Sequence, residues 1–193
     1  MVSGLYRIRA APRMVLLALL CGLSVAGTPG ELPVGAELRE ARLAGLNGPD
    51  LHLSQLRGTP LLINVWASWC GPCQAEMASL ERLAWRELPV SVRIIGISTD
   101  DEKSAALALI LRTHATISHY LDRGREMEDM LGASRLPLTV FVDARGRVLR
   151  RVIGARDWDS AESRAMLVST FSPASTSARR GSRADGGSAG RGR

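Results

Sequence analysis

Two cysteines separated by two residues, Cys70 and Cys73, are the residues of this chain whose type and spacing point most directly to chemistry. They lie in the run Trp69-Cys70-Gly71-Pro72-Cys73, which follows an apolar stretch ending at Trp66. Where a strand ends and a helix begins, a thiol meets unpaired backbone N–H groups and the positive end of the helix dipole, which favour the thiolate. A second cysteine one turn later can attack the mixed disulfide formed by the first. The spacing therefore predicts thiol–disulfide exchange.

The elements that must position these cysteines can be read from the spacing of apolar residues. Residues 61–66 form a continuous apolar run, and residues 71–87 have helical spacing with Pro72 in the first turn, where a missing N–H costs little. Asn47-Gly48 between two short apolar segments is a strong hairpin signal. In chain order we expect a hairpin at 41–46 and 50–53, a turn at 54–58, a strand at 61–66, a helix at 71–87, a strand at 90–98, a helix from about 101 to 112, a strand at 117–121, a helix at 126–131, a hairpin at 138–142 and 147–153, and a helix at 159–171.

The last helix has its own start signal, because Asp159 is followed three residues later by Glu162, as in a capping box. Strand–helix–strand units come first along the chain, and an antiparallel hairpin with a helix comes last. This order predicts an α/β domain with a central mixed β-sheet flanked by helices on both faces and an N-terminal β-hairpin extension.

Both ends of the chain are expected to lie outside this domain, which we place at residues 33–171. Three arginines at the start precede a short apolar run and the small residues Ser24 and Ala26, which is the pattern of a secretory signal. Residues 1–26 are therefore predicted to be a signal peptide or an uncleaved membrane anchor, followed by a linker at 27–32. Residues 172–193 consist almost entirely of Ser, Gly, Ala, Pro, Thr and Arg and are predicted to form a disordered basic tail.

The net charge of +6 comes from the two ends of the chain. Of the 25 Lys and Arg residues, three precede residue 28 and five follow residue 172, whereas Asp185 is the only one of the 19 acidic residues found there. The middle of the chain then carries 17 basic and 18 acidic residues. It has no excess of positive charge of the kind a nucleic-acid interface needs, so we predict no nucleic-acid partner.

Cysteine usage indicates the compartment. The chain has three cysteines, and Cys21 lies within the predicted signal, so cleavage would leave only Cys70 and Cys73. An exported protein with one Cys-x-x-Cys pair is better explained as a redox catalyst than as a disulfide-stabilised scaffold. We expect the protein on the periplasmic side, either soluble after cleavage or tethered to the inner membrane.

The run Trp66-Ala67-Ser68-Trp69-Cys70-Gly71-Pro72-Cys73, followed by Gln74-Ala75-Glu76-Met77, closely resembles the TlpA/ResA branch of thioredoxin-like proteins. These are exported disulfide reductases and include the thioredoxin-like proteins of cytochrome c maturation. The resemblance extends to residues 53–58, 135–139 and 142–146, and it covers about residues 33–171. It implies a thioredoxin-like fold.

The resemblance also implies roles for individual residues. Cys70 resembles the exposed nucleophile and Cys73 the buried resolving thiol. Pro137 resembles a proline held cis beside the disulfide, which leaves the backbone of Leu136 free to pair with a substrate strand. Trp69, Gly71 and Pro72 complete the expected substrate groove. No cofactor is implied; the partners are protein disulfides, with cytochrome c and copper-site apoproteins both open, and a membrane electron donor of the DsbD or CcdA type.

Two polar residues near the cysteines are candidates for proton transfer. Glu76 follows Cys73 by one helical turn, and an acid at this position takes part in proton transfer in the ResA-like branch. A buried carboxylate there would have a raised pKa and could accept the proton of the resolving thiol. The alternative is a helix-surface glutamate paired with Arg82 or another basic residue. Asn64 stands where cytoplasmic thioredoxins carry a buried aspartate, and because it cannot titrate, proton transfer is expected to fall to Glu76. Asn64 can at the same time be a polar core residue satisfied by backbone hydrogen bonds.

The chain departs from the TlpA/ResA pattern at two positions, and two functions other than disulfide reduction are to be considered. Ala78 stands where many relatives have a proline, and Leu138 replaces the small or hydroxyl residue often found after the cis proline. A zinc site would need two more ligands, and none of the three histidines is spaced to supply them, so we predict no metal. A thioredoxin fold used only for binding, or for assembling a metal site without redox turnover, is the alternative to catalysis.

Overall fold

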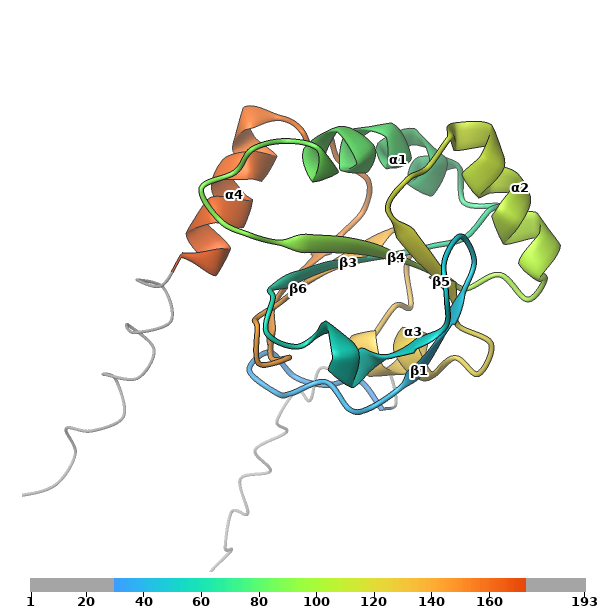
Figure 1. Ribbon diagram of the computed structural model, residues 1–193, viewed down its shortest axis with the longest axis horizontal. Coiled ribbons are helices and arrows are strands. Elements are labelled where there is room, and N and C mark those ends of the chain that lie inside the picture. The colour runs from blue at the N-terminus through green and yellow to red at the C-terminus, as the bar shows by residue number, and fades with distance from the viewer. Residues whose placement is uncertain (1–29, 173–193) are drawn as a thin grey trace, which may run out of the picture.

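A seven-stranded mixed sheet runs through the centre of the structure, a computed structural model that describes residues 30–172 (Figure 1). The strand order is β2-β1-β5-β4-β3-β6-β7. The strands are β1 (Arg42–Gly45), β2 (Leu51–His52), β3 (Leu61–Trp66), β4 (Arg93–Ser98), β5 (Ser118–Leu121), β6 (Leu138–Val142) and β7 (Val148–Ile153). The helices are α1 (Gly71–Ala84), α2 (Lys103–Thr113), α3 (Glu126–Leu131) and α4 (Ala161–Phe171), with a short 3-10 helix η1 (Leu53–Leu56).

The three central strands β3, β4 and β5 are parallel, and the outer strands are antiparallel to their neighbours. Helices α1, α2 and α4 cover one face of the sheet, whereas α3 lies against the other face (Figure 1). Every residue of β3 is buried, as expected for a central strand covered on both faces. The predicted mixed-sheet α/β fold is confirmed.

Side chains along β3 alternate between the two faces and so decide what lies under α1. Ile63 and Val65 pack into the core on the α3 side, whereas Leu62 and Trp66 pack under α1. Asn64 stands between Leu62 and Trp66 on the same face, and in the sheet register it lies opposite Thr139 of β6. The alternation therefore places one polar side chain in the middle of the apolar layer beneath α1.

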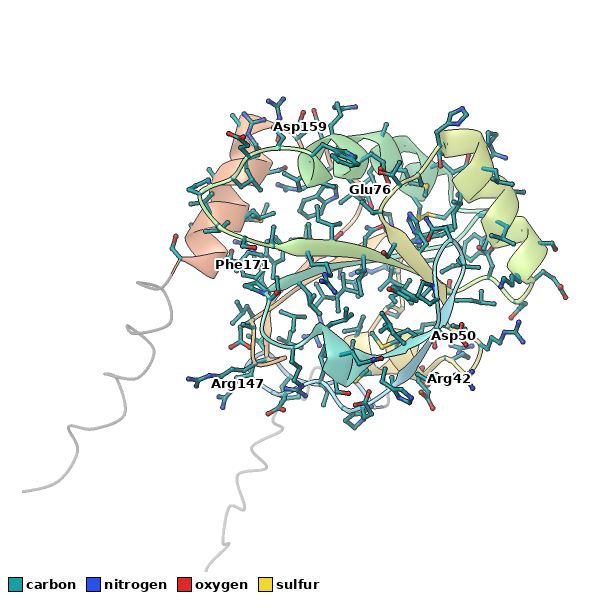
Figure 2. The ribbon with its side chains drawn as sticks, viewed as in Figure 1. Arg42, Asp50, Glu76, Arg147, Asp159 and Phe171 are labelled. Carbon is teal, nitrogen blue, oxygen red and sulfur yellow. A yellow bond between two sulfur atoms is a disulfide. The ribbon has the colours of Figure 1, made fainter. Side chains whose placement is uncertain are left out.

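The predicted N-terminal hairpin is present and extends the sheet. Strands β1 and β2 pair antiparallel, and β1 also pairs with β5. Asp50 closes the hairpin by accepting from Gly45 N at 2.8 Å and pairing with Arg42 at 2.9 Å (Figure 2). The turn is fastened to β5 because Asn47 Oδ1 accepts from His119 N at 2.8 Å.

Three predicted boundaries were wrong. Helix α1 ends at Ala84 rather than near residue 87, and β4 begins at Arg93 rather than at residue 90. Helix α4 begins at Ala161, with Ser160 as its N-cap accepting from Ser163 N at 3.2 Å. Asp159 cannot cap this helix because its carboxylate is bound by Arg86. The partner of Glu162 is Arg156 rather than a cap N–H.

Several sequence predictions fall outside the described residues. The signal or anchor at 1–26, residues 27–29 of the linker, and residues 173–193 of the tail are not described. Leu32, in the described part of the linker, already packs on the domain, and its N–H donates to Met130 O at 3.0 Å. Within residues 30–172, no helix has the length and apolar character needed to span a bilayer.

Candidate active site

The cysteine pair lies at the junction that the sequence predicts, between the end of β3 and the start of α1. Cys70 is the N-cap of α1, and its sulfur accepts from Cys73 N at 3.2 Å. The two sulfurs form a disulfide with an S–S distance of 2.03 Å, so the structure is the oxidised form. Cys73 is completely buried, whereas Cys70 keeps 6% of its surface exposed. The two sulfurs are therefore not equivalent toward an incoming partner.

The loop before the cysteines is held by a residue that the sequence analysis missed. Asp100, buried just after β4, accepts from Ser68 N at 2.9 Å and from Ser68 Oγ at 2.7 Å. Ser98 Oγ also donates to Asp100, at 2.8 Å. Because β3 and β4 are parallel, the residues that follow them meet at one edge of the sheet, and this was the available signal. Asp100 thus fixes the approach to Cys70.

A groove of about 1050 Å³ passes over the exposed side of the disulfide. Four residues of the predicted substrate groove line it together with Cys70, namely Trp69, Gly71, Pro72 and Leu136. Trp69 is 72% exposed beside it. The fifth, Pro137, is buried behind Leu136, and the Leu136–Pro137 peptide bond is cis. The rest of the groove is strongly charged, with acidic and basic side chains: Asp100, Asp101, Glu102, Lys103, Asp122, Arg123, Arg125, Glu128 and Arg135.

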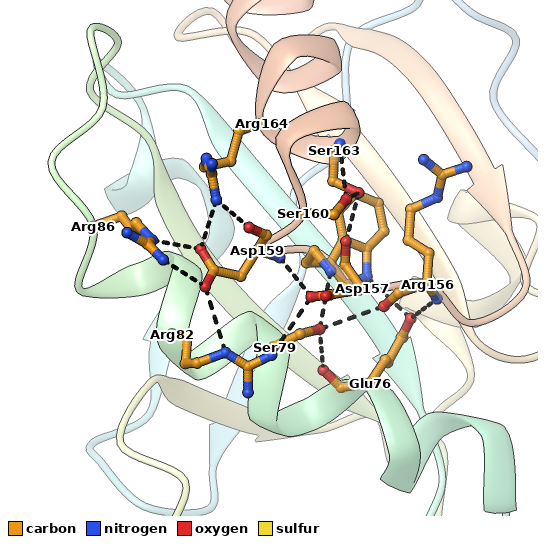
Figure 3. A network of polar contacts seen from close by, with 11 residues as sticks. Glu76, Ser79, Arg82, Arg86, Arg156, Asp157, Asp159, Ser160, Ser163 and Arg164 are labelled. Carbon is orange, nitrogen blue, oxygen red and sulfur yellow. Dashed lines mark hydrogen bonds and ion pairs between the residues drawn. The ribbon is translucent and has the colours of Figure 1, made fainter.

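Glu76 is buried on the inner side of α1, one turn after Cys73, and the alternative of a surface glutamate paired with Arg82 was wrong. Its Oε1 accepts from Asn64 Nδ2 at 2.8 Å. Its Oε2 accepts from Trp158 Nε1 at 3.0 Å and from Arg156 N at 3.2 Å (Figure 3). Burial raises the pKa of the Glu76 carboxyl, and these three hydrogen bonds oppose the rise because they stabilise the charged form.

Asn64 lies on β3 directly beneath Glu76. Besides Glu76, its side-chain amide donates to Thr139 Oγ1 at 3.0 Å. Its hydrogen bonds therefore go to side chains, not to the backbone groups considered in the sequence analysis. Asn64 and Glu76 meet because one is on the α1 face of β3 and the other on the inner face of α1.

Trp158 is a second site residue that sequence reasoning missed. It lies in the loop between β7 and α4, about eighty residues after Glu76, and it is fully buried. The only signal in the sequence was an isolated tryptophan between two aspartates, in the run Asp157-Trp158-Asp159. Such a pattern is equally typical of a core anchor, and only the folded chain brings its indole N–H to a carboxylate.

The floor below the cysteines contains a buried histidine. Trp66, which packs with both cysteines, donates from Nε1 to His119 Nδ1 at 3.1 Å, with the rings edge to face. Burial lowers the pKa of His119 to about 4, so the ring is neutral at pH 7 with its proton on Nε2. Gly96 leaves room for this pair, since a Cβ there would lie 2.1 Å from His119 Nδ1.

Among the described residues 30–172, no group of three or more His, Cys, Asp or Glu side chains is arranged to hold a metal ion. The chemistry that the arrangement supports is carried by the disulfide pair, the buried carboxyl of Glu76 one helical turn after Cys73, and the groove lined by Cys70.

Comparisons with known proteins identify the family of the chain. The profile of the Redoxin family matches residues 33–167. The thiol:disulfide interchange protein DsbE of Pseudomonas fluorescens biotype C is 35% identical over 67% of this chain and 73% of its own length. A thiol-disulfide oxidoreductase ResA of Bacillus cereus is 23% identical over 78% of this chain and 91% of its own length.

The fold is shared with a solved structure described as a DsbE-type thiol:disulfide interchange protein from Chlorobium tepidum. That structure matches with a TM-score of 0.65 and 20% identity, covering 72% of this chain and 98% of its own. The enzyme class predicted from Cys70 and Cys73 is confirmed by these matches. The chain therefore belongs to the redoxin family, as a thiol–disulfide oxidoreductase of the TlpA/ResA type.

Proposed function

We propose that this protein is an exported reductase of protein disulfides, with Cys70 as the attacking thiol and Cys73 as the resolving thiol. The observation that carries the proposal is the unequal exposure of the two cysteines. Cys70 borders the groove, whereas Cys73 is completely buried one turn from Glu76. A substrate disulfide lying in the groove can reach only the first of them.

In the reduced enzyme the Cys70 thiolate attacks one sulfur of the substrate disulfide. A mixed disulfide forms, and the other substrate sulfur leaves as a thiolate. Cys73 then attacks the Cys70 sulfur, releases the second substrate thiolate and closes the Cys70–Cys73 disulfide. Two electrons pass from the enzyme dithiol to the substrate disulfide, and the released thiolates take up protons.

Cys73 must lose its proton before it can attack, and Glu76 is the proposed acceptor. Its carboxyl is buried one helical turn after Cys73 on the same face of α1, and burial raises its pKa, which makes the carboxylate a better proton acceptor. Asn64 supports this role by donating to the carboxyl without titrating itself. Leu136 and Trp69 line the groove together with Cys70, and the substrate backbone would lie in this groove.

Export and the source of electrons complete the proposal. The arginines and the apolar run in residues 1–26 support export, with cleavage or membrane anchoring as the two routes. A reductase in an oxidising compartment leaves each cycle oxidised, so it needs a donor, and a membrane conduit of the DsbD or CcdA type fits the TlpA/ResA relationship. The Gly71-Pro72 pair between the cysteines favours the reducing direction.

The first test is the reduction potential of the protein in a glutathione buffer, followed by tryptophan fluorescence because Trp69 adjoins Cys70. A value at or below about −230 mV would support a reductase, whereas about −120 to −180 mV would indicate an oxidase or isomerase. Cys73→Ser should in addition trap substrates as stable mixed disulfides on Cys70, and Cys70→Ser should trap none. Failure to trap any protein would favour a module that binds without redox turnover.

A further inference from the structure

The loop from residue 154 to residue 160, between β7 and α4, is attached to α1 beside the redox pair. Trp158 makes two of these attachments. Its indole N–H donates to Glu76 Oε2 at 3.0 Å, and its backbone N–H donates to Ser79 Oγ at 3.0 Å. Ser79 Oγ in turn donates to Glu76 O at 2.7 Å. Helix α1 therefore holds the ring of Trp158 one turn after Cys73, at Glu76, and its backbone nearly two turns after Cys73, at Ser79.

The next residue, Asp159, fastens the same loop to the last turn of α1 and to the residues just beyond it. Arg86 binds its carboxylate through two hydrogen bonds, at 2.6 and 2.9 Å. Arg82 Nε lies 3.4 Å and Arg164 Nη1 lies 3.3 Å from the same carboxylate (Figure 3). These three arginines around Asp159 form what we call the arginine clamp. Because Trp158 directly precedes Asp159, the clamp restricts where the indole can lie.

The ring itself is enclosed on the sheet side. Trp158 packs with Phe141 of β6, with ring centroids 6.2 Å apart, and with Leu167 of α4. The Arg156 guanidinium lies 6.0 Å from the Trp158 ring centroid, while Arg156 N shares Glu76 Oε2 with the indole. Two donors of this loop, the Trp158 indole N–H and the Arg156 backbone N–H, thus converge on Glu76 Oε2.

We propose that Trp158 is a positioning residue for the redox reaction: its indole N–H, held in place by the arginine clamp, orients the Glu76 carboxyl and stabilises its charged form while Cys73 exchanges its proton. This inference rests on the proposed role of Glu76. It adds to that role a residue from the opposite end of the domain sequence, and it connects the start of α4 with the cysteine pair.

The groups that donate hydrogen bonds to the Glu76 carboxyl are uncharged, and the charged side chains nearby pair with other residues. Cys70 and Cys73 form the disulfide and do not titrate in this state. The charged groups on the surrounding elements are Glu81 and Arg82 of α1, Arg86 just beyond its end, Arg156, Asp157 and Asp159 of the loop, and Glu162 and Arg164 of α4; β3 and β6 contribute the uncharged Asn64 and Thr139. No cation pairs with Glu76 in the described chain, and the guanidinium of Arg156 pairs with Glu162. A cation at Glu76 would hold it ionised, whereas neutral donors leave it able to take up a proton.

The test measures the pKa of Glu76 by NMR of its side-chain carboxyl carbon as the pH of the full-length protein is raised. Trp158→Phe keeps an aromatic ring and removes the indole N–H, so the pKa of Glu76 should rise by about one pH unit. The pH dependence of the thiol–disulfide exchange rate should move by the same amount. Trp85→Phe is the matched control: it removes the indole N–H of an exposed tryptophan, bound only to Thr116 Oγ1, and should change neither.

A second measurement does not depend on how well the variant folds. In the wild-type protein, the indole N–H resonance of Trp158 should shift with pH at the pKa of Glu76, and it should stop doing so in Glu76→Gln. An unchanged pKa in Trp158→Phe, or an indole resonance that does not follow the carboxyl, would overturn the inference. Failure of the proposed function gives a different result. In that case the exchange rate of Glu76→Gln would keep the pH profile of the wild-type enzyme, while in the wild-type protein the Trp158 indole resonance would still shift with the ionisation of Glu76.

Discussion

Glu76 and Asp159 are two carboxylates attached to the same helix, α1, with pKa values shifted in opposite directions. Glu76 is reached by neutral donors only, and burial raises its pKa. Asp159 is bound by the arginine clamp, and the Arg86 hydrogen bonds, followed by its charge and the contact with Arg164, lower its pKa to about 2. The Asp159 side chain is itself covered, but its arginine partners are roughly half exposed, so water still reaches the charges.

The difference shows that the kind of partner matters as much as burial. The contribution of Glu76 to stability is fully present below its unfolded pKa of 4.5 and is lost as the pH rises through its folded pKa. The contribution of Asp159 is present above 3.8 and is lost as the pH falls through about 2. The carboxyl of Glu76 is therefore the one better able to take up a proton, whereas Asp159 keeps a fixed charge that links the start of α4 to the end of α1.

The largest effect is expected from removing Trp158, the residue that connects the Glu76 site with the Asp159 site. Trp158→Ala leaves a cavity between α1, α4 and β6 and removes a donor to Glu76, so we expect the free energy of unfolding to fall by about 3–5 kcal/mol. Chemical denaturation at pH 7 measures this. Trp85→Ala is the control, since Trp85 is 78% exposed and its loss should cost less than about 1 kcal/mol. Equal losses in the two variants would contradict the structural role of Trp158.

His119 extends the comparison to a buried base, because its hydrogen-bond partner, Trp66, is neutral like the partners of Glu76. Its folded pKa of about 4 lies below its unfolded value of 6.5, so its contribution is present above pH 6.5 and is lost as the pH falls through about 4. We expect roughly 3 kcal/mol of stability to be lost between these two pH values from this group. His119→Gln can still accept from Trp66 and does not titrate. Denaturation curves of wild type and variant should therefore converge as the pH falls toward 4; a constant difference would contradict the assignment.

The smallest expected effect is at the arginine clamp. Asp159→Asn removes the charge and keeps the shape, so it should lower the midpoint of denaturation only slightly at pH 7. The effect should shrink in 1 M salt, because the arginines are solvated and salt screens exposed charges. Glu76→Gln should show no such salt dependence. If the effect of Asp159→Asn on the denaturation midpoint did not change with salt, the electrostatic difference between Asp159 and Glu76 would be smaller than their hydrogen-bond partners indicate.

Local signals were strong enough to predict the site in part. The Cys-x-x-Cys spacing, the apolar run of β3 and the helical spacing after Pro72 together placed the disulfide at the start of α1. The boundaries were less well predicted at α4, because the carboxylate of Asp159 could serve either a helix cap or an arginine. The arginines that decided the matter, Arg82 and Arg86, lie on another helix and just beyond its end.

The sequence by itself determined the chemistry, the order of the elements and the positions of Cys70 and Cys73, because these depend on neighbours within one or two turns of the chain. Only the tertiary structure decided the environment of Glu76. Its partners come from β3 and from a loop about eighty residues later, and the pKa of a carboxyl depends on what surrounds it in space. For the same physical reason, the histidine under Trp66 and the tryptophan above Glu76 became visible as site residues only once the sheet and helices were packed.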